Sequence, residues 1–287
     1  MGTEGIRRIA MYGRNGVGKT TISGNLSVAL SRAGHRVLVV GCGGKTDSAT
    51  SLQGNMSVPT LLEHMRKRPA ASPEDVVQEG FAGVFCLETG APPVGEANPD
   101  ASIMSAVQRI NESGLLERLA LDYVIYNVQG DEAGGGFTVP IRKGLFQNIF
   151  TVMAGELKSV RAANSIFELI RQHTADGGVR SGDIIANFMD APYSRALVDE
   201  YAERTSARVV AYLPRSFRLE SPERREKAVF EDPLLAEAFD SLALKIATHG
   251  DSRIPHPLPP DDIWRFSMKW NTRFMEMEAG EGAGAGI

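Results

Sequence analysis

The fold of this chain is decided by residues 13–20, which read Gly13-Arg14-Asn15-Gly16-Val17-Gly18-Lys19-Thr20. The run fits the pattern G-x-x-x-x-G-K-[ST], in which glycines let backbone N–H groups turn inward around phosphate oxygens. An apolar run over residues 9–12 precedes it, and a helical apolar pattern follows it. The sequence therefore predicts a strand, a phosphate-binding loop and a helix whose N-terminus adds favourable partial charge for an anion.

Two side chains of this loop have distinct expected roles. Lys19 is expected to reach the β- and γ-phosphates of a nucleotide, and the Thr20 hydroxyl to ligate Mg²⁺. The residues of this region that we expect to bind the nucleotide are Arg14, Asn15, Gly16, Val17, Gly18, Lys19, Thr20 and Thr21.

Apolar runs typical of covered strands alternate with helical stretches along most of the chain. The runs cover residues 9–12, 37–40, 84–87, 123–128, 149–153, 184–188 and 209–213. Helical stretches lie near residues 102–111, 160–172, 196–205 and 233–248. Strands separated by helices of this size are parallel and joined by right-handed crossovers. We therefore expect an α/β fold over residues 1–253, with a doubly wound, mostly parallel sheet and helices on both faces.

The end of the chain has a different pattern. Four prolines in residues 254–260 exclude a helix there and predict an extended linker. A helical apolar stripe follows within a linker-and-helix segment that we place at residues 254–278; its members are Ile263, Phe266, Trp270, Phe274 and Met277. The stripe fits docking either on its own domain or on a partner subunit. Residues 279–287 are rich in Gly and Ala and are expected to be disordered.

Composition narrows the class of protein. The net charge is −4, which argues against a general nucleic-acid binder. Only Cys42 and Cys86 carry thiols, too few for a disulfide scaffold, and this usage fits a reducing cytoplasm. No apolar run approaches the ~20 residues that a membrane helix needs. We expect a cytoplasmic protein with neither a nucleic acid nor a membrane as partner.

Several stretches, taken in order with the phosphate loop, carry a family resemblance. They are Gly41-Cys42-Gly43-Gly44-Lys45-Thr46-Asp47-Ser48, Gly83-Val84-Phe85-Cys86-Leu87-Glu88-Thr89-Gly90, Gly130-Asp131-Glu132-Ala133-Gly134-Gly135-Gly136-Phe137, Val139-Pro140-Ile141-Arg142 and Leu213-Pro214-Arg215. From about residue 9 to residue 257 the chain resembles the nitrogenase iron protein family of deviant P-loop NTPases. That family includes the ATP-binding subunits of the dark-operative protochlorophyllide and chlorophyllide reductases.

The resemblance implies a homodimer that binds ATP and holds one [4Fe–4S] cluster between its subunits, each subunit supplying two cysteines. ATP binding and hydrolysis then gate electron delivery to a partner reductase. At the two cysteine positions this chain has Asn98 and Gly134, and neither residue replaces a thiolate on iron. We therefore expect no iron–sulfur ligands and no conventional bridging cluster. Cys42 and Cys86 match positions that are not ligands, and packing is their default role.

The nucleotide site departs from the family pattern as well. Arg14 stands where the family has a lysine that reaches the other subunit's ATP, and Gly43 and Asn127 replace two carboxylates. Losing these acids weakens the hold on Mg²⁺ and on the attacking water. The catalytic residues stay unassigned; the candidates are Arg14, Lys45, Asp47 and Asp131, with Glu132 as a new acid beside them. The family's adenine contacts map to Asn187, Pro214 and Arg215, which a solvated loop would equally explain.

Three functions are compatible with this pattern. The first is a cluster-free, ATP-binding homodimer that acts as a nucleotide-dependent switch or assembly factor with weak ATPase activity. The second is an ATP-dependent, electron-donating reductase component that works with a two-subunit reductase-like partner and an unusual cluster. The third is a positioning or partitioning ATPase, which Trp264, Trp270, Lys269 and Arg273 of the terminal stripe favour.

Overall fold

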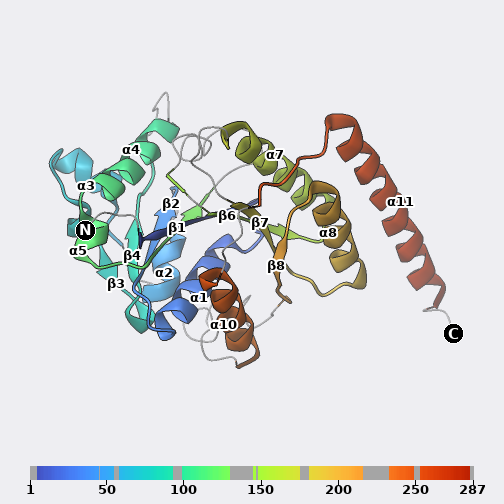
Figure 1. Ribbon diagram of the computed structural model, residues 1–287, viewed down its shortest axis with the longest axis horizontal. Helices are drawn as coiled ribbons and strands as arrows, with labels where there is room; N and C mark the ends of the chain where they lie inside the picture. Colours follow the sequence, from blue (N-terminus) through green and yellow to red (C-terminus); the bar gives the residue numbers. More distant parts are fainter. Residues whose placement is uncertain are drawn as a thin grey trace.

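A mostly parallel sheet forms the centre of the molecule (Figure 1), in a computed structural model that describes residues 5–44, 46–54, 58–92, 99–129, 145–146, 148–174, 181–215, 233–248 and 253–284. Within these residues the sheet has eight strands, in the order β3-β4-β2-β5-β1-β6-β7-β8. Their bounds are β1 Arg7–Tyr12, β2 Val37–Cys42, β3 Gln78–Glu79, β4 Phe85–Glu88, β5 Tyr123–Val128, β6 Asn148–Ala154, β7 Ser181–Asn187 and β8 Val209–Tyr212. Only β3 runs antiparallel to its neighbour, β4. The expected doubly wound α/β fold is confirmed.

Helices cover both faces of the sheet. Their bounds are α1 Lys19–Arg32, α2 Asp47–Gln53, α3 Leu61–Lys67, α4 Pro99–Glu112, α5 Leu115–Arg118, α7 Leu157–His173, α8 Pro192–Thr205, α10 Pro233–Ala247 and α11 Pro260–Gly284. Apolar side chains of α1, α2 and α10 pack on one face, and those of α4, α5, α7 and α8 pack on the other. Because β2 and β5 are covered on both sides, all six residues of each are buried, as their continuous apolar sequences require.

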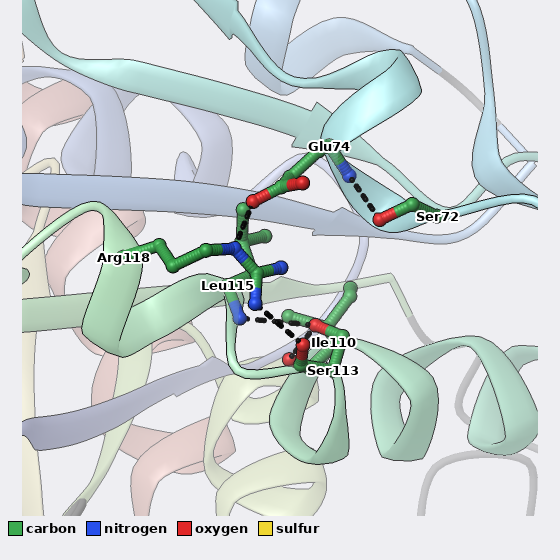
Figure 2. A network of polar contacts seen from close by, with 6 residues as sticks. All are labelled: Ser72, Glu74, Ile110, Ser113, Leu115 and Arg118. Atoms are coloured by element: carbon green, nitrogen blue, oxygen red, sulfur yellow. Dashed lines mark hydrogen bonds and ion pairs between the residues drawn. The ribbon is translucent and has the colours of Figure 1, made fainter.

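Two one-turn 3-10 helices, η2 (Pro73–Val76) and η3 (Phe81–Gly83), precede β4. Figure 2 shows how η2 is fixed to the α4–α5 junction: Arg118 pairs with Glu74, and its guanidinium also donates to the Ser113 carbonyl at 3.0 Å. The Ser113 hydroxyl accepts from the Leu115 N–H at 3.2 Å and donates to the Ile110 carbonyl at 3.0 Å. These bonds satisfy backbone groups at two helix ends, so we assign the network to the fold and not to chemistry.

The terminal stripe docks on its own domain. Phe266 and Trp270 are buried, and the Phe266 ring lies 6.0 Å from the ring of Tyr201 in α8. The extended linker is held by Asn164 of α7, whose side chain accepts from the Leu258 N–H at 2.8 Å and donates to the Leu258 carbonyl at 3.0 Å. These contacts favour docking on the same domain over docking on a partner subunit.

Two expectations about the terminal helix need correction. The helix α11 continues to Gly284, past residue 279, where the sequence predicts the start of a disordered tail. Lys269 and Arg273 both pair with Glu200 of α8, so these cations serve intramolecular docking. The described helices include none that is long and apolar enough to cross a membrane.

Candidate functional site

The topology places the candidate site at the carboxyl end of β1. This strand lies between β5 and β6: the crossover from β1 leads to β2 on one side, and the later crossover from β5 leads to β6 on the other. Ligands of open α/β sheets bind in the crevice that such a reversal creates. Residues 13–18 fill the turn from β1 to α1, so the phosphate-binding loop lies at this position.

Two glycines of the loop are required by close approach of the chain. Gly13 has φ 144° and Gly18 has φ 100°, both in the region that favours glycine. A Cβ atom at Gly13 would lie 2.3 Å from the Val152 carbonyl oxygen of β6, and one at Gly18 would lie 2.3 Å from Asn187 Nδ2 of β7. The loop is therefore wedged between the ends of two neighbouring strands.

Lys19 bonds through its side chain to the backbone of its own loop. Its side chain is 7% exposed, and Nζ donates to the carbonyl oxygens of Gly13 at 2.8 Å and Arg14 at 3.0 Å. An ammonium group held among inward-facing N–H groups and a helix N-terminus makes an electropositive concavity that suits a polyphosphate.

Asn127 connects the loop to the neighbouring strands. Its side chain is fully buried at the end of β5, and Nδ2 donates to Thr20 Oγ1 at 2.9 Å and to Ser48 Oγ at 2.8 Å. Its Oδ1 atom has no hydrogen-bond partner among the described residues. A carboxylate at this position would accept from both hydroxyls, so the amide reverses the polarity of the contact and removes one negative charge.

The same residues are compatible with Mg²⁺. Thr20 would ligate the ion directly, and the unpartnered Asn127 oxygen is able to accept from a water on it. When bound, Mg²⁺ neutralises phosphate charge that develops during phosphoryl transfer. The described residues fit the ion with neutral oxygens, a weaker donor set than carboxylates provide.

At position 43, an acidic side chain would have no room beside Gln129. A Cβ atom there would lie 2.3 Å from Gln129 Oε1 and 2.7 Å from Gln129 Cβ, so the Gln129 side chain fills the space an acid would occupy. The Gly43 N–H donates to Thr89 Oγ1 at 3.2 Å, which fixes this loop to the end of β4.

Of the three residues predicted for the adenine side, Asn187 contacts the phosphate loop. Asn187 is buried and donates from Nδ2 to the Val17 carbonyl at 2.8 Å. The Arg215 guanidinium lies 4.5 Å from the ring centre of Phe188 and pairs with Asp190 at 3.3 Å. Pro214 is exposed beside it. Sequence reasoning took Phe188 as the last residue of a strand, whereas it follows β7 with φ 60°, a left-handed conformation rare outside glycine.

Arg14 makes a contact within its own chain. Its Nη1 atom lies 2.9 Å from Oε1 of Glu156, the residue before α7, and both side chains are partly exposed. Sequence reasoning did not single out Glu156, because the two residues lie 142 positions apart and neither pattern points to the other.

The remaining predicted site residues are either exposed or outside the described residues. Asp47 is exposed as the first residue of α2. Lys45, Asn98, Asp131, Glu132 and Gly134 lie outside the described residues.

The two thiols of the chain are both buried. Cys42 and Cys86 are buried in separate apolar clusters, and their sulfurs lie 3.8 and 3.7 Å from the carbonyl oxygens of Val40 and Val84. Burial raises the pKa of Cys86 to about 12 and that of Cys42 further, with the Glu88 charge adding to both effects. Cluster iron is held by thiolates, whereas each of these two buried sulfurs lies against the carbonyl oxygen of the residue two positions before it.

The sheet order and the wedged loop at β1 define the class: the protein is a P-loop NTPase in fold. More narrowly, the chain belongs to the NifH/frxC family of 4Fe-4S iron sulfur cluster binding proteins, whose model matches residues 7–272. The family resemblance inferred from the sequence is thereby confirmed.

Individual relatives agree with this assignment. The chain is 38% identical to the nitrogenase iron protein 2 of Paenibacillus durus over 278 residues, which cover 96% of this chain and 95% of that protein. It is 35% identical to the nitrogenase iron protein of Methanospirillum hungatei JF-1, over 92% of this chain and 96% of that protein.

Solved structures show the same fold at lower identity. The MinD cell division protein of Aquifex aeolicus superposes with a TM-score of 0.65 and 19% identity, covering 85% of this chain and 98% of that one. The Pyrococcus horikoshii septum site-determining protein MinD, complexed with Mg-ADP, gives a TM-score of 0.63 at 18% identity, over 85% and 96% of the two chains.

Proposed function

We propose that this protein is an ATP-binding homodimer that lacks the family's iron–sulfur cluster and acts as a nucleotide-dependent conformational switch or assembly factor. ATP would lie with its phosphates in the loop of residues 13–20, near Lys19, and with Mg²⁺ at Thr20. The intact loop and helix N-terminus support the binding of a nucleotide. A relative of the same fold, the Pyrococcus horikoshii protein, is complexed with Mg-ADP.

The observation that carries the proposal of weak hydrolysis is the Asn127 side chain. It donates to Thr20 and Ser48 where a carboxylate would hold Mg²⁺ and orient water. Gly43 supplies no acid at the second position, where Gln129 fills the space. The loop that would bind phosphate is thus intact while two acids of the family pattern are replaced, which is the division expected of a switch.

The proposed absence of a cluster rests on which residues stand at the family's ligand positions. Asn98 and Gly134 replace the expected thiolates, and both remaining thiols are buried. The test is iron content after anaerobic reconstitution, together with an EPR spectrum after reduction. We expect substoichiometric iron and no cluster signal. A stoichiometric four-iron cluster per dimer would overturn this proposal and establish the reductase component instead.

That second candidate, an electron-donating reductase component, is favoured by one observation: the family model is one of cluster-binding proteins, and it matches residues 7–272. It requires ligands other than Cys42 and Cys86. A partner of either kind is best sought by co-purification with and without ATP, because a switch is expected to hold its partner in only one nucleotide state.

A further inference from the structure

A buried carboxyl group lies one strand away from Asn127. Glu88, the last residue of β4, is 0% exposed, and its Oε1 atom accepts from the Ala49 N–H at 2.7 Å. Its Oε2 atom is buried and has no hydrogen-bond partner among the described residues. Desolvation raises the pKa of Glu88 to about 7, against the lowering effect of the Ala49 and Ser48 backbone N–H groups; nearby Asp47 raises it further.

Glu88 serves as the cap of α2. The helix begins at Asp47, and its own N-cap residue, Thr46, makes no side-chain cap. The Glu88 carboxyl supplies the missing acceptor from a neighbouring strand. It reaches α2 across Gly41, where a Cβ atom would lie 1.7 Å from Glu88 Oε2, so only glycine leaves room for this path.

The capped turn lies between two fixed regions. On one side, Ser48 Oγ accepts from Asn127, which also donates to Thr20 of the phosphate loop. On the other side, Thr89 follows Glu88, and its carbonyl accepts from the Leu62 N–H at 2.9 Å. Thr89 Oγ1 donates to the Gly41 carbonyl at 3.0 Å and accepts from Gly43.

We propose that Glu88 is a positioning residue which, by capping α2, sets Ser48 against Asn127 and so couples the Thr20 side of the phosphate site to residues 89–92 after β4. The route is Thr20, Asn127, Ser48 and then Glu88, each joined to the next by a hydrogen bond of a side chain or of the first turn of α2. The short helix α2 joins the two sides physically, because its first turn bonds to Asn127 on one side and to Glu88 on the other. The nucleotide-driven half of this proposal rests on the proposed function, whereas the capping half does not.

Amide hydrogen exchange tests both halves. In Glu88→Leu the acceptor is gone, and exchange of the peptide covering residues 47–53 is expected to rise ~10-fold or more over wild type without nucleotide. Glu88→Gln keeps a carbonyl acceptor and should stay within ~3-fold of wild type. Gly41→Ala displaces an unchanged Glu88 and should match Glu88→Leu. Leu87→Ala, on the opposite face of β4 and in the core cluster away from α2, is the control for a general loss of packing and should leave this peptide unchanged relative to α1.

The second measurement adds ATP and Mg²⁺ to each variant. Wild type and Glu88→Gln should change exchange at residues 47–53 and 89–92 on binding, and Glu88→Leu should bind with similar affinity but lose the change at residues 89–92. Full protection of residues 47–53 in nucleotide-free Glu88→Leu would overturn the cap. A retained response at residues 89–92 in that variant would overturn the coupling. If wild type binds no nucleotide, the proposed function and the coupling both fail, and the nucleotide-free comparison still decides the cap.

Discussion

The two sides of the phosphate site differ in how much of their chemistry is retained. On the α1 side, the chain keeps every feature expected of a phosphate loop: Lys19, the wedged glycines and the helix N-terminus. On the β2–β5 side, Gly43 and Asn127 stand in place of two acids, and the side chain of Gln129 fills the space beside Gly43. The comparison teaches that the loop residues and the residues at the ends of β2 and β5 are separate sets, so under the proposed function one set can keep binding while the other changes turnover.

The largest expected effect is a loss of ATP affinity when Lys19, on the α1 side of the site, is removed. Lys19→Ala removes the one buried cation of the loop, and ATP affinity measured by calorimetry should fall ~100-fold or more, because charge-assisted bonds to phosphate are lost. Lys67→Ala, at an exposed lysine paired with Glu63, is the control and should bind like wild type. Equal ATP affinity in Lys19→Ala and wild type would show that the loop of residues 13–20 does not bind the phosphates of ATP.

The next largest effect is expected on ATP turnover, when an acid is restored on the β2–β5 side of the site. Asn127→Asp restores an acid beside Thr20 and Ser48, and steady-state ATP turnover should rise ~10- to 100-fold, since positioned acid–base groups typically contribute ~10²–10⁴-fold. Adding Gly43→Asp should help only when Gln129 is replaced by Gly, because Cβ of Gln129 as well as Oε1 lies in that space. A wild-type turnover already at ~1–100 s⁻¹ would contradict the switch proposal.

A third prediction concerns pH. The folded-state pKa of Glu88 is raised from 4.5 to about 7, so its contribution to stability is present below pH 4.5 and is lost as pH rises through 7. Glu88→Gln does not titrate. The unfolding free energy of this variant relative to wild type should therefore increase by ~3 kcal/mol between these limits, at ~1.36 kcal/mol per unit. The Cys42 and Cys86 thiols have pKa values above this window and add no slope.

Urea unfolding at a series of pH values measures this difference. A difference between the two proteins that does not vary with pH would show that Glu88 titrates near its ordinary value.

The smallest effect concerns Arg14. Its pair with Glu156 is partly exposed, so Glu156→Gln should change the unfolding free energy by less than ~1 kcal/mol. Releasing Arg14 should favour the contact with the other subunit's ATP that the family resemblance implies. Sedimentation equilibrium should show ATP-dependent dimerisation strengthened ~2- to 5-fold. Weaker dimerisation would mean that Glu156 itself serves the interface.

What the sequence predicted well was local. The phosphate loop is one run of eight residues, and the buried strands are continuous apolar runs, so both were visible without a structure. The short elements β3, α2 and α3 were missed, because two to seven residues give too little periodicity. The Glu88–Ala49 bond spans 39 positions and Asn127–Thr20 spans 107, and no local pattern encodes such distant pairs.

The bonds of Lys19 to its own loop have a kinetic consequence. Two carbonyl oxygens of the loop hold its ammonium group, so contacts within the chain fix the shape of the loop. Association of a nucleotide should then need little reordering of the loop, and its rate constant should differ little between the nucleotides that fit. Discrimination between di- and triphosphates would reside in how long each one stays. The lifetime of the bound nucleotide would then set how long this protein remains in one state.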